Sequence, residues 1–436
     1  MKKISLFLIA IAMCVAMVSC NDNDVVKEEM EEVPSSIYDL RIPVKPMKLS
    51  SKQQTMMNEN NVFALRFLDE VNKMEKAEKS FFFSPLSLTY LFGMANNAGD
   101  DNAHDWIEKL LGFSEGGLDE LNAYCETLIT QLPEVDPQVK FGIANAFFAN
   151  KGVGYSLNQT FVETLQNHYK ATVDQLDFSA PKSLTTINNW CSEKTEGLVP
   201  KMFEELDKSA LAMFINALYF QGEWSSKFNK KNTKKADFFS PQGKVKVNMM
   251  SQKALASCGE TDVFDYLNLP YGNGLWGIQI LMPKQGKTIG DVITSMRETG
   301  ADKVLWSNAF SEVAEVEIKL PRFETSSTTD ELGEHGLKEL IQKMTGRFFL
   351  DNFSGMYADY ASDDAIELAM MLQKAKISVD ETGAKAAVVS VAEAMCGSAG
   401  EREYEERKFT ADHPFIYVIR EISSGAIVFV GKFTGK

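Results

Sequence analysis

The sequence predicts one large α+β domain that follows an export signal and a short tether. Beyond residue 50, helical apolar spacing dominates the first part of the chain, whereas apolar runs and alternations of strand length dominate the second part. No linker, repeat or shift in composition divides residues 51–436. The chain has 436 residues, of which 44% are hydrophobic, so it can bury a large core. Helices grouped apart from strands are typical of the α+β class.

The first predicted elements are a helix, a short strand and a second helix. Apolar residues recur at helical spacing in the first helix: Ala64, Phe67, Leu68, Val71 and Met74. Residues 81–83 predict a short buried strand. Ser84 and Pro85 then favour a helix start, because Ser caps free N–H groups and Pro suits the first helical position. Residues 86–98 are apolar on nearly every side, which predicts a buried helix.

The later segments predict mainly strands. Apolar runs or alternations of strand length occupy residues 141–149, 212–220, 276–282, 314–320 and 375–379. Near the C-terminus, residues 415–419 and 427–430 form two further runs, and Ser423-Ser424-Gly425 lies between them. This arrangement predicts a β-hairpin.

One pattern matches an enzyme motif. Gly112-Phe113-Ser114-Glu115-Gly116 fits the Gly-x-Ser-x-Gly turn of hydrolases, in which Ser114 would be the nucleophile. That chemistry needs a strand before the turn and a helix after it. The residues before this turn are instead apolar at helical spacing. We therefore predict that the chain has no catalytic residue and is not an enzyme.

Neither a metal nor a cofactor is predicted. No two of the four histidines are spaced as helix-borne ligands, and no Cys-x-x-Cys pair is present: the histidines are His104, His168, His335 and His413. We expect buried single thiols at Cys125, Cys191 and Cys258.

The charge pattern argues against nucleic acid as a partner. The net charge is −15, which opposes non-specific binding to nucleic acid. One basic cluster stands out, formed by Lys227, Lys230, Lys231, Lys234 and Lys235. It could bind sulfated glycans, although a solvated surface is the more common meaning of such a cluster.

The first 19 residues have the features of a secretion signal. Lys2 and Lys3 precede an apolar run over residues 4–18, which is too short for a transmembrane helix. The run ends in Met17-Val18-Ser19-Cys20, which resembles a bacterial lipobox, although Met17 replaces the usual Leu. The resemblance implies a lipid anchor on Cys20. Asn21 after it favours the outer membrane of a Gram-negative bacterium. An ordinary signal peptide cut at another small residue is the alternative.

Residues 20–50 are expected to be a disordered tether. Acidic residues crowd this stretch, and Pro34, Pro43 and Pro46 interrupt any helix. Such a segment cannot bury enough apolar surface to order itself.

Residues 384–395 have two distinct faces at the period of a strand. One face has only small or medium uncharged residues: Ala384, Ala386, Val388, Ser390, Ala392 and Ala394. The other face carries both charges, Lys385 and Glu393. A segment that must at times become a buried central strand needs this sorting, because a charge on its inner face would be costly. An ordinary edge strand followed by a surface loop is the alternative.

Motifs along residues 51–436 resemble those of the serpin family. The strongest match is Val379-Asp380-Glu381-Thr382-Gly383-Ala384-Lys385-Ala386-Ala387, which looks like the serpin hinge. The others, in family order, are Phe83-Ser84-Pro85-Leu86-Ser87, Asn188-Asn189-Trp190 with Thr195-Glu196-Gly197, Asn216 to Trp224 with Phe228, Leu269-Pro270-Tyr271, Leu320-Pro321-Arg322-Phe323, and Asp412-His413-Pro414-Phe415 with Gly431-Lys432.

The resemblance implies a fold and a mechanism. It implies about nine helices and three sheets, with a large central sheet and an exposed reactive loop. A protease attacks the loop as a substrate and forms its acyl-enzyme. The cut loop then inserts into the large sheet and traps the protease. The implied partners are serine proteases, with cysteine proteases as a second class of target, and the free protein is expected to be a monomer.

The family spacing from Glu381 places the cleaved bond at Gly397–Ser398. Counting back from Phe409 lands near Gly400, and Met395 and Cys396 remain alternative positions. The hinge comprises Glu381, Thr382, Gly383, Ala384, Lys385, Ala386 and Ala387. No Lys or Arg lies between Glu393 and Gly400, which favours elastase-like or subtilisin-like targets over trypsin-like ones.

A second set of residues is implied to control opening of the large sheet. Gln373 stands where the family commonly has His, and we expect it to pair with Asn216 and with the region of Ser84 and Ser87. The competing function is a serpin fold that no longer inhibits and acts as a surface binding protein. Such members usually carry charged or bulky residues on the inner hinge face, which this sequence lacks.

Overall fold

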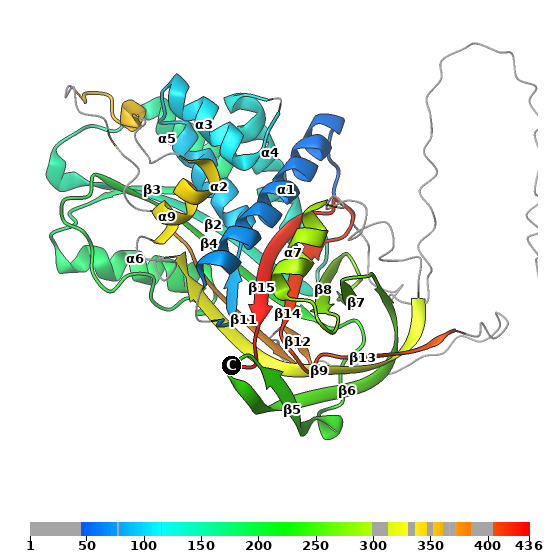
Figure 1. Cartoon of the computed structure of the whole chain (residues 1–436). Helices are drawn as coiled ribbons and strands as arrows, with labels where there is room; N and C mark the ends of the chain where they lie inside the picture. Colours follow the sequence, from blue (N-terminus) through cyan, green and yellow to red (C-terminus); the bar gives the residue numbers. More distant parts are fainter. Residues whose placement is uncertain are drawn as a thin grey trace, which may run out of the picture. The chain divides into compact units, whose positions relative to one another are not determined.

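A continuous network of hydrogen-bonded strands organises the chain (Figure 1). The structure is a computed structural model, and it describes residues 45–75, 78–114, 116–298, 313–329, 336–346, 352–360, 366, 371–384 and 404–436. The strand order is β1-β15-β14-β8-β7-β6-β9-β11-β12-β4-β2-β3, with β10 beside β4, β13 beside β9 and β5 beside β6.

The described strands and helices have the following bounds. The strands are β1 (Phe81–Phe83), β2 (Val139–Asn150), β3 (Thr172–Leu176), β4 (Ala212–Glu223), β5 (Lys234–Ser240), β6 (Gly243–Glu260), β7 (Phe264–Tyr271), β8 (Trp276–Pro283), β9 (Val313–Thr328), β10 (Met371–Leu372), β11 (Lys374–Asp380), β12 (Gly383–Ala384), β13 (Glu406–Thr410), β14 (Phe415–Glu421) and β15 (Ile427–Phe433). The α-helices are α1 (Ser51–Met74), α2 (Pro85–Asn96), α3 (Asp101–Leu111), α4 (Leu118–Gln131), α5 (Gln159–Tyr169), α6 (Pro181–Lys194), α7 (Ile289–Glu298) and α9 (Gly336–Thr345).

Strand β9 belongs to two parts of the strand network. Its C-terminal half pairs antiparallel with β11, from Phe323 opposite Val379 to Thr328 opposite Lys374. Its N-terminal half pairs with β6 and with β13. The three sheets expected from the sequence are therefore joined into one hydrogen-bonded network, and the predicted α+β class is confirmed.

Helix α2 lies at the centre of the core. Ser84 caps it, Pro85 occupies its first turn, and every residue of the helix is buried. The helix contacts both β4 of the large sheet and β15 of the hairpin. Phe82, just before it, stacks on Phe429 with ring centroids 4.9 Å apart. A helix that is buried on all sides needs no polar face. The apolar run in the sequence therefore predicted this helix correctly.

Most of the other predicted elements are confirmed as well. The predicted strands correspond to β2, β4, β8, β11 and the first half of β9, and β14 pairs antiparallel with β15 as the predicted hairpin. Cys125, Cys191 and Cys258 are buried and form no disulfide among the described residues. Burial raises the pKa of the Cys125 thiol to about 12, so this thiol stays protonated. No helix in the described ranges combines the length and apolar character needed to cross a membrane.

Candidate functional site

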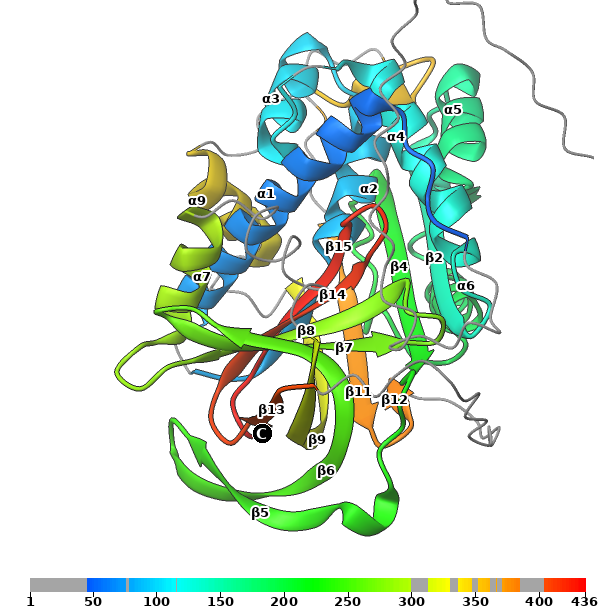
Figure 2. The same ribbon diagram turned by 90° about the vertical axis from the view of Figure 1, so that its right-hand side faces the viewer.

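Strands β4 and β11 are joined at their two ends but not between them. At one end, β10 pairs in parallel with β4, with Met371 opposite Phe214. At the other end, Ala384 of β12 pairs with Val379 of β11 and with Gly222 of β4. Between these ends, the described residues of β4 and β11 share no backbone ladder. Figure 2 shows β11 and β12, in orange, beside β4, in green.

Unpaired edges on two facing strands can accept another strand. Backbone N–H and C=O groups without partners favour the addition of a strand. A strand placed between β4 and β11 would form hydrogen bonds with the facing edges of both. The hinge segment already begins such a strand with Gly383 and Ala384. The site is therefore a partly occupied position within the large sheet.

Gly383 is required by its backbone conformation and by close packing. Its φ angle is +140°, which side chains other than hydrogen rarely tolerate. A Cβ atom at this position would lie 2.1 Å from the carbonyl oxygen of Gly222 in β4. Only glycine lets the chain turn into the sheet at this point.

Ala384 is the first side chain that enters the sheet. It is 1% exposed, and Val379 beside it is fully buried. A small apolar side chain suits this buried position, because it needs neither a polar partner nor the space that a long side chain would take. This burial agrees with the inner face assigned to Ala384 from the sequence.

The turn between β11 and β12 is held by the segment that follows β4. The backbone N–H of Trp224 donates to the Thr382 carbonyl at 2.9 Å, and that of Phe228 donates to the Glu381 carbonyl at 3.0 Å. The Trp224 indole N–H donates to the Asp380 carbonyl at 2.8 Å. The Trp224 ring also stacks on Tyr271 at 4.5 Å, which fixes its position.

Glu381 is a buried carboxylate at this turn. It is 3% exposed, and the hydroxyl of Thr233 donates to its Oε1 atom at 2.7 Å. The guanidinium of Arg322 lies 3.9 Å from its Oε2 atom. These contacts offset the cost of burying the carboxylate and fix the start of the hinge.

Gln373 ties the other end of the site to helix α2. Its amide nitrogen donates to the Ser84 carbonyl at 2.6 Å, and its amide oxygen accepts from the Ser84 N–H at 2.7 Å. Ser84 in turn caps α2 by accepting from the Ser87 N–H at 3.1 Å. Gln373 therefore links the strand segment between β10 and β11 to the start of the central helix.

The prediction that Gln373 pairs with Asn216 is wrong. Asn216 donates to Asn145 at 2.7 Å instead, and Asn145 donates to the Tyr169 carbonyl at 2.8 Å. The Gln373 side chain is already engaged at both ends by the Ser84 peptide group. Among the described residues, the buried Asn216 Oδ1 and Ser87 Oγ atoms have no hydrogen-bond partner.

Replacing Gln373 should destabilise the uncleaved protein strongly. Gln373→Leu leaves the buried N–H and C=O groups of Ser84 without partners, so we expect a loss of about 2–4 kcal/mol in unfolding free energy. Ser87→Ala is the matched control, because its Oγ makes no hydrogen bond among the described residues and should cost less than about 1 kcal/mol. Denaturant unfolding of both variants checks this. Equal losses would contradict the assigned role of Gln373.

Several residues of the predicted site fall outside the described residues. They are the predicted bond at Gly397 and Ser398, its alternatives Met395 and Cys396, the hinge residues Lys385, Ala386 and Ala387, and the predicted anchor Cys20. The roles assigned to them stay predictions.

Ser114 lacks the setting of a hydrolase nucleophile. Helix α3 ends at Leu111, and Gly112 closes it in the left-handed conformation, so a helix rather than a strand precedes the motif. The Ser114 hydroxyl donates to the carboxylate of Glu59. Tertiary structure therefore agrees with the sequence argument against a nucleophile at this position.

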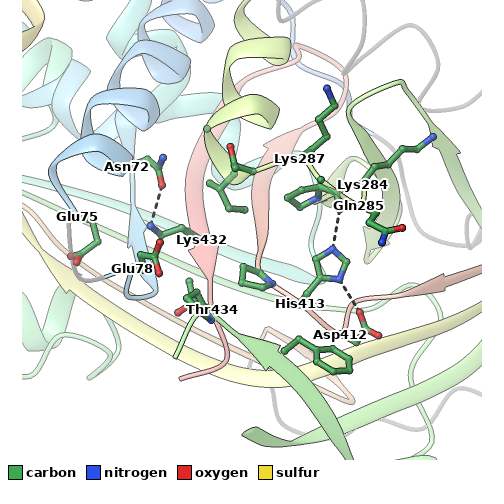
Figure 3. A pocket seen from close by; sticks show the side chains of 18 of the residues that line it. Asn72, Glu75, Glu78, Lys284, Gln285, Lys287, Asp412, His413, Lys432 and Thr434 are labelled. Carbon is green, nitrogen blue, oxygen red and sulfur yellow. Dashed lines mark hydrogen bonds and ion pairs between the residues drawn. The ribbon is translucent and has the colours of Figure 1, made fainter. Parts of the chain in front are cut away.

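A pocket of about 1090 Å³ lies at the end of α1. Figure 3 shows Lys432 pointing towards Asn72 and His413 pointing towards Asp412. Lys432 donates to Asn72 at 3.0 Å, and the two ring nitrogens of His413 contact Asp412 and the Pro283 carbonyl at 2.8 and 2.9 Å. Both ring nitrogens of His413 are therefore in contact with groups of the protein itself. No group of three or more potential metal ligands occurs in the part of the chain that the structure describes.

The sequence alone does not identify the residues that anchor the hinge turn. Trp224, Phe228 and Tyr271 belong to motifs that resemble those of the family, but these motifs do not predict that the three residues hold the hinge turn. Thr233 gave no signal, because its contact with Glu381 joins residues 148 positions apart.

Comparisons with known proteins find similarity to one family over most of the chain. A family model described as "Serpin (serine protease inhibitor)" matches residues 58–435. Iripin-3 of Ixodes ricinus is 30% identical over 365 residues, covering 81% of this chain and 88% of that protein. A serpin-like protein of Methanosarcina acetivorans is 26% identical over 379 residues, covering 86% of each chain. The native structure of the thermophilic serpin Tengpin has a TM-score of 0.74 at 23% identity, covering 90% of this chain and 97% of that chain.

Proposed function

The chain belongs to the serpin family and has the serpin fold, and on that premise we propose that it inhibits serine-type proteases as a suicide substrate. The observation that carries the proposal is the gap in pairing between β4 and β11, whose end is already occupied by Gly383 and Ala384. The sequence after Ala384 has the small inner face that a strand in this gap would need.

The proposed reaction begins as ordinary proteolysis of the loop. The serine oxygen of the protease forms an ester with the carbonyl carbon of the residue before the cleaved bond. The peptide C–N bond breaks, and the new amine takes the proton that the serine has lost. The loop, still bound to the protease, then inserts between β4 and β11 before water can hydrolyse the ester. Inhibition depends on insertion being faster than deacylation.

The direct test is a covalent complex that survives denaturing electrophoresis. We expect such complexes with elastase-like or subtilisin-like proteases and few with trypsin, because Ala394, Met395 and Cys396 suit uncharged pockets. A trypsin-like pocket holds a buried acidic group and would lack a basic partner from this loop. The mass of the C-terminal fragment identifies the bond, for which we expect cleavage at Gly397–Ser398 or after Met395 or Cys396.

Two results would overturn the assignment of targets. One is a fragment that begins at Glu403, after Arg402, together with faster inhibition of trypsin than of elastase. The other is complete loop cleavage by every protease tested with no covalent complex, which would favour a non-inhibitory binding protein.

Export and lipid anchoring are a separate part of the proposal. The apolar run that ends at Cys20 supports a lipid-modified N-terminus at the outer membrane. Metabolic labelling with a fatty-acid analogue is expected to mark the wild type and not Cys20→Ala. Cys14→Ala is the matched control and should label normally, because Cys14 lies within the removed signal. Equal labelling and membrane retention of Cys20→Ala would exclude the anchor.

A further inference from the structure

The pocket at the end of α1 combines an apolar wall with charged ends. Its volume of about 1090 Å³ lies at the upper end of the range that suits a drug-sized ligand. In Figure 3, Lys432 of β15 lies at one end beside Glu78, and Lys284 and Lys287 lie at the other end. The apolar wall is formed by Phe239, Pro241, Pro283, Ile289 and Pro414.

Phe239 presents an exposed aromatic ring to this pocket. Among the described residues, two large hydrophobic side chains are exposed, Phe239 at 51% and Val62 of α1 at 50%. The backbone of Phe239 is held in place, because its N–H donates to the Asp412 carbonyl at 2.7 Å and its strand pairs with β6. A ligand that covers this ring would bury apolar surface without having to order the chain that carries it.

Lys432 carries an ammonium group that the protein satisfies in part. The residue is 4% exposed, its Nζ atom donates to Asn72 Oδ1 at 3.0 Å, and the same atom lies 5.0 Å from the centroid of the Phe81 ring. An ammonium group has three donors, and no described carboxylate forms an ion pair with this one. Burial lowers the pKa of Lys432, and the charges of Glu75 and Glu78 offset this in part. A bound anion would supply a further acceptor and favour the charged form.

The charges of the lining favour a ligand with one negative charge. Four lysines and three acidic residues line the pocket, a net charge of +1 with His413 neutral, whereas the whole chain has −15. Lys73 and Lys284 pair with carboxylates outside the pocket. Lys287 and Lys432 are the two lining lysines that form no ion pair with a described residue. Because acidic residues also line the pocket, a ligand with several negative charges would be repelled.

We propose that this pocket binds a small amphipathic monoanion, which has one carboxylate or sulfonate group on a rigid aromatic or fused-ring body. The anionic group would accept from the Lys432 ammonium, and the ring body would cover Phe239 and the neighbouring prolines. An uncharged apolar molecule would leave the ammonium without its further acceptor. This binding requires no cleavage of the reactive loop, so the inference is independent of the proposed inhibition.

Two fluorescent probes with the same rings test the proposal on the intact protein without protease. Anilinonaphthalene sulfonate carries one negative charge, and phenylnaphthylamine lacks the sulfonate. We expect one sulfonate probe to bind per chain. Lys432→Met should weaken binding of the sulfonate by about tenfold and change binding of phenylnaphthylamine by less than about twofold, because it removes a hydrogen bond between charged groups.

Phe239→Ser tests the apolar wall, and Val62→Ser is its matched control. Both replace a large apolar side chain that is half exposed, but Val62 does not line the pocket. Phe239→Ser should weaken binding of both probes by about fivefold, and Val62→Ser should alter it by less than about twofold. Thermal unfolding checks that each variant is folded. If Lys432→Met does not fold, the comparison of the two serine variants still decides whether the probes bind here.

Two outcomes would overturn the inference. One is equal binding of the probes by Phe239→Ser and Val62→Ser. The other is a folded Lys432→Met variant whose affinities for the two probes change by the same factor. Because the assay contains no protease, neither result bears on whether the protein forms covalent inhibitory complexes.

Discussion

Cleavage of the chain between residues 395 and 402 is expected to raise its melting temperature by about 10–20 °C. A freed loop that enters the gap between β4 and β11 would gain on the order of ten backbone hydrogen bonds, each contributing about 1 kcal/mol net. The intact protein would then be a trapped state that cleavage relaxes. For most proteins a nick in an exposed loop leaves stability unchanged or lowers it.

Calorimetry before and after limited proteolysis measures this effect. The cut is verified by the mass of both fragments, so that cleavage elsewhere is excluded. Gly383→Val is an informative control, because a side chain at that position would collide with the Gly222 carbonyl and block entry of the segment. We expect this variant to gain little stability when cut. An unchanged melting temperature in the cleaved wild type would remove the insertion mechanism.

Ala384→Arg is expected to convert an inhibitor into a substrate. Ala384 is 1% exposed, so an Arg there must either be buried without a partner or keep the hinge out of the sheet. An unpaired buried charge costs several kcal/mol, and each 1.4 kcal/mol added to the insertion barrier slows insertion about tenfold. Hydrolysis of the acyl-enzyme would then be faster than insertion of the loop. We expect loop cleavage at a similar rate and at least about tenfold less covalent complex per loop cleaved.

Lys385→Arg is the matched control for this variant. It places the same side chain one residue further along, on the face that the sequence assigns to solvent. Its yield of covalent complex should equal that of the wild type. If Ala384→Arg inhibits normally and Lys385→Arg does not, the inner face begins one residue later than proposed.

Local signals in the sequence are sufficient to predict several helices and strands. Ser84 and Pro85 mark the start of α2 because capping and a fixed φ angle act within one turn of helix. The β14–β15 hairpin was equally predictable, since its two strands are neighbours in the chain. Gly383 was recognised as part of a hinge, and the structure supplies the reason in its contact with Gly222.

Long-range features could not be predicted in the same way. The strand predicted over residues 314–320 runs on through Pro321, which lies opposite Met249 of β6, and ends at Thr328. The expected pairing of Gln373 with the Ser84 region is confirmed, whereas the expected pairing with Asn216 is wrong, because the Ser84 peptide group occupies both ends of the Gln373 amide. The Trp224 contact with Asp380 joins residues 156 positions apart, and no local pattern encodes it.

The early pairing of Gly383 and Ala384 changes the kinetic character of insertion. The first residues of a new strand are the least favourable to place, because they restrict the chain before many hydrogen bonds form. Here those residues are already paired with both β4 and β11. The proposed insertion would therefore be elongation from an existing nucleus, in which each added residue brings its own hydrogen bonds. Its rate should depend on how well each successive inner side chain fits and only weakly on the length of loop beyond the cleaved bond.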